Sequence, residues 1–189
     1  MRVLGIDPGS RRTGWGIVAR GAGRYELVAA GVIVTDPSAP IHTRLARIHA
    51  GLLDVVRTHA PQAVAIEAIF AHRSAASALV LGQARGVALL AAASAGTPVY
   101  EYNAMTIKRS VAGSGTADKA AMQRMVGLLL GEDVPGPHDA ADATALAITH
   151  HAHALQAQAI TRASRALPAP PAPVRPLPAG VRLGRRSRR

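Results

Sequence analysis

The 189-residue chain contains no cysteine, so disulfide bonds and thiolate metal sites are excluded and the composition fits a reducing cytoplasm. We expect no signal peptide, because the apolar run at residues 3–6 is too short for one. No apolar run matches the ~20 residues of a membrane span. The longest candidate, residues 75–95, carries Gln83 and Arg85, which favours a buried helix. The sequence therefore predicts a cytoplasmic protein without a membrane partner.

Acidic residues are absent from the last part of the chain. Residues 162–189 contain eight arginines and no acid, whereas residues 1–161 contain 14 basic and 11 acidic residues. This segment has many prolines and few large apolar groups, so we predict one folded domain, 1–161, and a disordered basic tail, 162–189. Such a tail binds polyanions without reading their sequence; a solubilising tail with no target is the alternative.

The hydrophobic patterns predict an α/β fold, with a mixed sheet flanked by helices. We expect strands at residues 3–7, 14–19, 25–34, 63–70 and 98–102, and helices at 43–59, 74–95, 104–111, 119–130 and 139–157. Short, turn-rich links join the first three strands, which indicates an antiparallel meander. His150, His151 and His153 are expected at the exposed end of the last helix.

Four acids stand among apolar neighbours. Asp7 ends the first strand and Glu67 lies near the end of the fourth, while Asp139 and Asp142 are three residues apart on one face of a helix. Four carboxylates brought together repel strongly, and hard divalent cations such as Mg²⁺ offset this repulsion best. Two such ions about 4 Å apart commonly catalyse in-line attack on a phosphodiester.

Each acid also has a structural explanation. Asp7 could close an Asx turn, Glu67 could pair with Arg73, Asp139 could be a helix N-cap, and Asp142 could be a first-turn acid favoured by the helix dipole. All four together favour catalysis, because the chain lacks the motifs of other enzyme classes. It has no G-x-x-x-x-G-K-[ST] loop, no H-E-x-x-H motif and no nucleophile elbow.

Four segments carry a resemblance to the RuvC Holliday-junction resolvase family over about residues 1–155. They are "GIDPGSRRTGWG", "IEAIFAHRSAASALVLGQARG", "EYNAMTIKRSVAGSGTADKAAMQRMV" and "DAADATALAITHHAH", in the family's order and near its spacing. The resemblance implies a ribonuclease-H-like fold and a homodimer. It also implies symmetric cleavage of four-way junction DNA with two Mg²⁺ or Mn²⁺ ions per site, alongside the RuvA–RuvB branch-migration complex. The Pro/Arg tail departs from the family pattern.

The same resemblance assigns roles to individual residues. It implies that Asp7, Glu67, Asp139 and Asp142 are the catalytic acids that hold the metals. Some relatives carry histidine at the position of Asp139, so His138 is an alternative ligand.

The basic residues near these motifs are candidates for DNA contacts. Lys108 and Lys119, the only lysines in the chain, match basic positions near the scissile phosphate in the family, so they are also expected among the catalytic residues; a solvated lysine on a helix is the alternative for each. Phe70, the only phenylalanine, is predicted to stack on an unpaired base, with burial in the core as the alternative. Further backbone-phosphate contacts are expected from Arg73, Arg109 and Arg124.

The helix expected at residues 74–95 is apolar on nearly every side. One face suffices for the sheet, so a second face could pack against the same helix of another copy; deep burial in one domain is the alternative.

Two other function classes share part of the pattern. The sugar-kinase, actin and chaperone ATPases need a second phosphate loop and a longer chain. An RNA-processing nuclease or an inactive DNA-binding relative would share the fold, but the "DAAD" and "GQARG" segments favour a junction resolvase.

Overall fold

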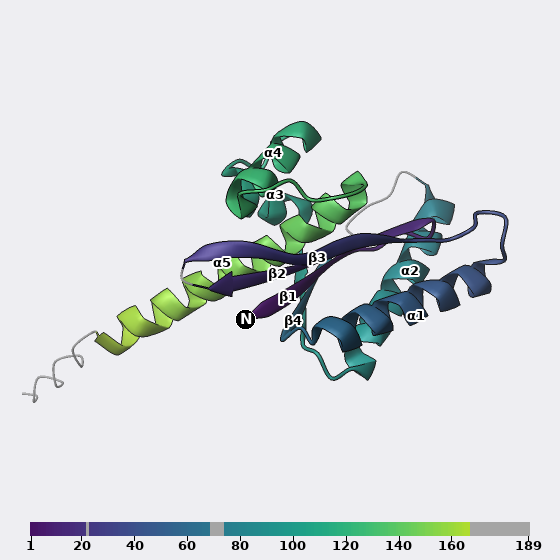
Figure 1. Ribbon diagram of the computed structural model, residues 1–189, viewed down its shortest axis with the longest axis horizontal. Coiled ribbons are helices and arrows are strands. Elements are labelled where there is room, and N and C mark those ends of the chain that lie inside the picture. Colours follow the sequence, from purple (N-terminus) through teal and green to yellow (C-terminus); the bar gives the residue numbers. More distant parts are fainter. Residues whose placement is uncertain (22, 69–73, 167–189) are drawn as a thin grey trace, which may run out of the picture.

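The computed structural model contains one five-stranded sheet with helices on both faces (Figure 1), and it describes residues 1–21, 23–68 and 74–166. The strands are β1 (Arg2–Asp7), β2 (Arg12–Gly21), β3 (Arg24–Val34), β4 (Ala63–Glu67) and β5 (Val99–Tyr102). The helices are α1 (Ile41–His59), α2 (Ala75–Ser94), α3 (Ala104–Ala112), α4 (Lys119–Leu130) and α5 (His138–Ala166).

The sheet has the order β3-β2-β1-β4-β5. The first three strands form the predicted antiparallel meander, in which Asp7 pairs with Gly14. Strand β4 runs parallel to β1, and β5 runs parallel to β4. The carboxyl ends of β1 and β4 therefore meet at one edge of the sheet, which brings Asp7 and Glu67 to that edge.

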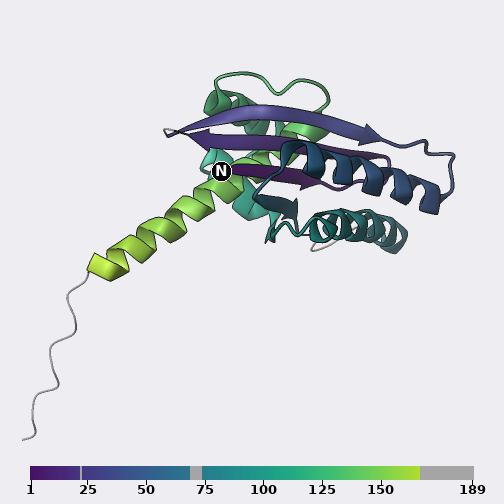
Figure 2. The same cartoon turned by 60° about the horizontal axis from the view of Figure 1, so that its bottom comes forward.

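Two hydrophobic cores cover the two faces of the sheet, and Figure 2 shows α1 and α2 together on one of them. Side chains alternate across β1, so Leu4 and Ile6 join the core under α1 and α2, while Val3 joins the core formed with α3, α4 and α5. Both faces are buried, which explains why residues 3–6 of β1 carry no polar side chain before Asp7.

Three glycines let α5 lie directly against β1 and β2. A Cβ atom on Gly5 would stand 1.8 Å from the carbonyl oxygen of Ala143, and one on Gly14 would stand 2.0 Å from that of Asp139. A Cβ atom on Gly16 would also collide with the α5 side chain Thr144. The glycines of the "GIDPGSRRTGWG" segment thus fix how close the first turns of α5 come to the sheet.

Helix α5 differs from the sequence-based prediction in length and in burial. It continues to Ala166, so the expected boundary at residue 161 falls inside it and residues 162–166 are helical. Alanine, glutamine and arginine are strong helix formers, and the first proline after this stretch is Pro168. The rest of the predicted tail, 167–189, lies outside the described residues. Figure 1 shows α5 projecting beyond the sheet.

The sequence predicts three histidines at the exposed end of the last helix, and for His150 and His151 this prediction is wrong. His150 and His151 are buried, because α5 continues beyond them and both point at other elements. His151 Nε2 donates to the Val18 carbonyl at 3.0 Å, and His150 Nδ1 lies 2.8 Å from the Tyr102 hydroxyl. These two histidines are packing residues.

Helix α2 packs against the core through small residues. Its buried side chains are all alanines, whereas Leu79 and Leu90 are 66% and 56% exposed. The alternative prediction, that this helix is deeply buried within one chain, is therefore wrong. Of the helices in the described residues, α2 alone has the length and hydropathy of a membrane span, with 22% of it buried. That test uses length and composition only.

Candidate active site

Two strands and one helix bring four carboxylates together. Asp7 and Glu67 end neighbouring parallel strands, and Asp139 and Asp142 stand in the first turns of α5. Gly14, which pairs with Asp7 and touches the backbone of Asp139, sets the distance between β1 and α5. The fold therefore brings these acids near one another, as the sequence predicts.

A hollow of about 230 Å³ lies beside three of these acids. Its polar wall consists of Asp7, Glu67, Asp142, Lys108 and Lys119. The remaining wall is apolar and comes from α3, α4 and α5: Ala104, Ile107, Met122, Ala145 and Leu146. Charged groups of both signs thus face one another across a partly apolar cleft, which strengthens their electrostatic interactions.

The electrostatics of the cluster are dominated by Asp7. Burial, followed by the charges of Asp142, Glu67 and Asp139, raises the pKa of its carboxyl from 3.8 to about 7, and the charge of Lys119 opposes this rise. Burial, followed by the charge of Asp142, also raises the pKa of Glu67. Carboxylates that resist ionisation in this way indicate a site that needs added positive charge.

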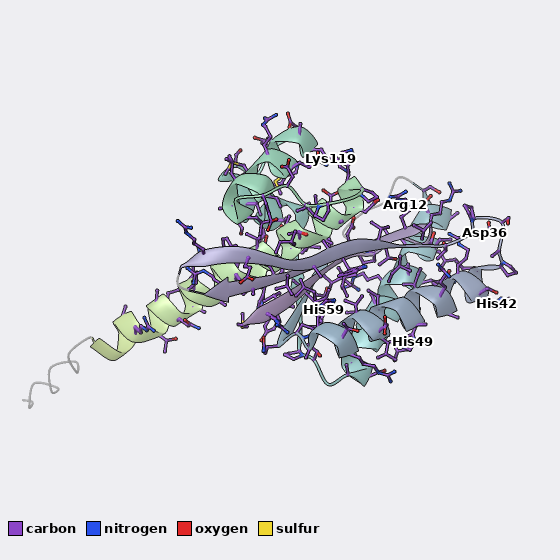
Figure 3. All side chains as sticks on the ribbon, viewed as in Figure 1. Arg12, Asp36, His42, His49, His59 and Lys119 are labelled. Carbon is purple, nitrogen blue, oxygen red and sulfur yellow. The ribbon has the colours of Figure 1, made fainter. Side chains whose placement is uncertain are left out.

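Two cationic side chains form ion pairs with the acids of α5. Lys119 Nζ lies 3.0 Å from Oδ2 of Asp142, and this hydrogen bond raises the pKa of Lys119. Arg12 Nε donates to Oδ2 of Asp139 at 2.7 Å. Figure 3 shows Lys119 and Arg12 on opposite sides of the start of α5. Neither Asp7 nor Glu67 has an ion pair within the described part of the chain.

The helix starts place the lysines at the cleft. The side chain of Asp118 caps α4 by accepting from the Ala121 amide at 2.7 Å, so that Lys119 is the first residue of the helix. Asn103 caps α3 in the same way, accepting from the Thr106 amide at 2.8 Å, and Lys108 follows one turn later. The caps direct both lysines from separate helices to one cleft.

The donor set suits a hard divalent cation, since all four acids offer oxygen ligands only. In the present arrangement, however, no three His, Asp or Glu side chains among residues 1–21, 23–68 and 74–166 are gathered closely enough for one ion. Arg12 and Lys119 hold the two α5 carboxylates instead. Each of these ion pairs engages one oxygen, Oδ2, of its carboxylate.

The other predicted site residues have separate surroundings. His138 Nδ1 lies 2.5 Å from Nε2 of Gln123 on α4, and His138 does not line the hollow. Arg109 packs beside Gly115 in the glycine loop. Arg124 lines a different groove. Phe70 and Arg73 lie outside the described residues.

Sequence reasoning missed two arginines at the site. Arg12 holds Asp139 as described above. Arg85 of α2 donates to the Glu67 carbonyl at 3.3 Å and forms an ion pair with Glu101, so it ties the end of β4 to β5. Arg85 could have been identified from the sequence, because it is a charged residue within the otherwise apolar sequence of α2. No local feature around Arg12 indicates a contact with residue 139.

Comparison with known proteins agrees with this geometry. The family model described as "Crossover junction endodeoxyribonuclease RuvC" matches residues 3–150. A RuvC from Xanthobacter autotrophicus is 47% identical over 153 residues, covering 81% of this chain and 90% of the relative. A RuvC from an Anaeromyxobacter species is 46% identical over 202 residues, covering 100% of this chain and 97% of the relative, so this match extends over the tail region as well.

A solved structure gives the same result. Thermus thermophilus RuvC in complex with a Holliday junction substrate has a TM-score of 0.78 and 42% identity, covering 83% of this chain and 96% of its own. The implied ribonuclease-H-like fold is confirmed. The chain belongs to the RuvC family of crossover junction endodeoxyribonucleases.

Proposed function

We propose that this chain resolves four-way DNA junctions by paired, symmetric, divalent-metal-dependent cleavage in recombination and repair. The observation that carries the proposal is the cluster of Asp7, Glu67, Asp139 and Asp142 at one sheet edge, with two lysines facing it across the cleft. Membership of the RuvC family supports the same reaction class and the junction as substrate.

The four acids would hold two Mg²⁺ ions, or Mn²⁺ in their place, with Asp7 between Glu67 and the two acids of α5. When bound, such ions supply the positive charge that activates a water for in-line attack on phosphorus and stabilises the departing 3′ oxygen. The raised pKa of Asp7 supports this role, because burial and the neighbouring acids both disfavour its charged form and a bound cation would offset both.

The chain's own residues position the DNA strand. Lys119 pairs with Asp142 in this structure, and opening that pair would direct its ammonium group toward a phosphate in the cleft. Lys108 faces the same cleft from α3. Their charges stabilise the negative charge that develops on the phosphate, and cleavage leaves 5′-phosphate and 3′-hydroxyl ends.

Contacts outside the cleft would hold the junction arms. Arg109 and Arg124 lie on α3 and α4, two of the helices that form the cleft, and suit backbone phosphates, which position DNA without specifying sequence. Phe70 and Arg73 follow Glu67 closely in sequence, and their roles as base-stacking and phosphate contacts remain part of this proposal.

The exposed face of α2 suits a homodimer. Leu79 and Leu90 are exposed there, and a Cβ atom on Gly82 or Gly86 would meet nothing within 4 Å in the described part of the chain. A partner helix could approach this small-residue face closely, and a two-fold dimer would present two active sites to two symmetric strands. The proposal includes a cytoplasmic location, which the cysteine-free composition suits, and cooperation with a branch-migration complex, which the family resemblance supports.

A side-by-side assay tests the proposal. Labelled four-way junction, an RNA precursor and ATP are each incubated with the protein in Mg²⁺, with EDTA and Asp142→Asn as controls. We expect paired nicks at symmetric positions of the junction only, sealable by DNA ligase and absent from both controls. Turnover of RNA or ATP in place of the junction, or junction cleavage that survives EDTA, would refute the proposal.

A further inference from the structure

Arg12 is held in place by its neighbours in the chain. It begins β2, where it pairs with Val34 of β3. The loop before it is fixed by the buried Thr13, whose hydroxyl donates to the Gly9 carbonyl at 2.8 Å, and by the Thr35 amide, which donates to the Arg11 carbonyl at 3.0 Å. The backbone that carries the guanidinium is therefore rigid on both sides.

The partner of Arg12 is brought to it by the fold. Gly14, two residues further along β2, lies against the backbone of Asp139, where any larger residue would collide. The first turn of α5 therefore stands beside the start of β2, and the Arg12 Nε to Asp139 Oδ2 distance is 2.7 Å across 127 positions of sequence. This ion pair is a consequence of how α5 seats on the sheet.

The pair is placed where it can open. The side chains of Arg12 and Asp139 are 44% and 31% exposed, and Nε is the one guanidinium nitrogen of Arg12 with a hydrogen bond among the described residues. An ion pair at this level of exposure contributes little free energy, so a cation that binds the carboxylate more tightly can displace the guanidinium group. A divalent ion that binds Oδ2 of Asp139 must compete with Arg12 for that oxygen, and the positive charge of Arg12 also opposes the approach of any cation.

We propose that Arg12 is a positioning residue that holds Asp139 in the metal-free protein and weakens the binding of divalent cations at the active site. The inference rests on the proposed function, in which Asp139 is a metal ligand. Arg12 acts through Asp139: it keeps the carboxylate ordered and neutralised until a divalent ion displaces it. A purely structural tether between β2 and α5 would instead leave metal affinity unchanged.

Binding of Mn²⁺ to the full chain without DNA tests this directly. Free Mn²⁺ is measured by electron paramagnetic resonance, and the active-site component is the part that Asp7→Asn removes. We expect Arg12→Ala to lower the Mn²⁺ concentration at half-saturation about two- to fivefold, the range that exposed ion pairs of this kind span. Arg12→Lys, which keeps the charge, should stay near the parent.

Two further variants isolate the pair. Arg24→Ala removes the same charge at the opposite end of β2 and β3 and should leave Mn²⁺ binding unchanged. In an Asp139→Asn background, Arg12→Ala should have lost most of its effect, because the two substitutions act on one interaction. Arg12→Gln gives the same comparison should the alanine variant fold poorly.

The outcomes separate this inference from the function on which it rests. Unchanged or weaker Mn²⁺ binding by Arg12→Ala, with normal binding by the parent, overturns the role of Arg12 alone. An equal gain in the Asp139→Asn background overturns it as well, since the effect would then come from net charge. Absence of an active-site component in the parent overturns the metal site itself and this inference with it.

Discussion

The ammonium nitrogen of Lys119 lies 3.0 Å from Oδ2 of Asp142, so the first residue of α4 is joined to the second turn of α5 directly over the catalytic cleft. The bond partly neutralises the carboxylate whose charge, after burial, does most to raise the pKa of Asp7. Lys119 is mostly exposed and can leave Asp142 when another cation arrives. Under the proposed function, the same lysine would pair with Asp142 in the absence of metal and contact the phosphate when metal is bound.

Lys119→Ala should therefore slow cleavage without preventing junction binding. We expect a loss of roughly 100-fold or more in single-turnover rate at saturating Mg²⁺, as for other groups that stabilise transition-state charge. Lys119→Arg should recover part of it, because the charge returns with a different shape. Arg24→Ala serves as the charge-matched control. A Lys119→Ala rate within twofold of the parent would exclude the lysine from the reaction.

Asp7→Asn should abolish cleavage and, without metal, stabilise the fold. The folded pKa of Asp7, about 7, lies above its ordinary value of 3.8. Its neutral form is therefore favoured by folding, and the stability this contributes is complete below pH 3.8 and lost as the pH rises through 7. Asparagine stays neutral, so the variant should keep about 1–3 kcal/mol that the parent loses at pH 8.

Thermal unfolding in EDTA checks the sign of this effect. The Asp7→Asn variant should melt several degrees above the parent at pH 8 and within a degree or two of it at pH 4. Added Mg²⁺ should raise the melting temperature of the parent more than that of the variant, because ligand binding stabilises only a protein that binds it. A variant that melts below the parent at pH 8 would contradict the uncompensated charge at Asp7.

Gly14→Ala should disrupt the site from the sheet side. The new methyl group would stand 2.0 Å from the Asp139 carbonyl oxygen, so α5 must move away from β2. We expect a loss of about 1–3 kcal/mol in unfolding free energy and a larger proportional loss of cleavage, since Asp139 and Asp142 move together.

Gly21→Ala is the matched control for this change. Gly21 ends the same strand, and a Cβ atom there would meet nothing within 4 Å in the parts of the chain that the structure describes. Urea denaturation and junction cleavage are measured for both variants. Equal behaviour of the two would show that the contact of Gly14 with α5 does not position the acids.

Leu90→Arg should dissociate the proposed dimer. Leu90 is exposed on α2 within one chain, so arginine there should leave the monomer fold intact but place charge in a helix–helix interface. Sedimentation at micromolar concentration should show the parent at twice 19.5 kDa and the variant at 19.5 kDa. A monomeric parent that cuts both strands in concert would refute the dimer.

Much of the fold could be predicted because β1, β4 and α1 bury side chains in simple periods. Leu4, Ile6 and Val64 sit in continuous apolar runs, and Ile48 and Leu52 repeat at helical spacing. The acids at the ends of these strands could be predicted as site residues because the residues before them are apolar. Local pattern and tertiary structure agree here, since the sheet is buried on both faces.

Other features depend on contacts that no local pattern contains. The pairing of Arg12 with Asp139 arises from the seating of α5 on glycines of β1 and β2. His150 is buried because α5 passes Tyr102 at the sheet edge, a meeting that the "HHAH" sequence does not reveal. The end of α5 was misplaced by nine residues because its last turns are exposed and stabilised by helix propensity alone, without a hydrophobic stripe.

Truncation after Ala166 should separate catalysis from general DNA affinity. The cut preserves the whole of α5, whereas a cut at residue 161 would remove helical residues. The removed segment carries six arginines and no acid, and each phosphate it neutralises contributes about 0.9 to the slope of log affinity against log salt. We therefore expect unchanged melting temperature and unchanged single-turnover cleavage at saturating enzyme. Duplex and junction binding should weaken and become less sensitive to salt. Fluorescence anisotropy over a range of KCl concentrations measures the slope, and a slope equal to that of the full chain would show that the arginines of 167–189 do not contact DNA.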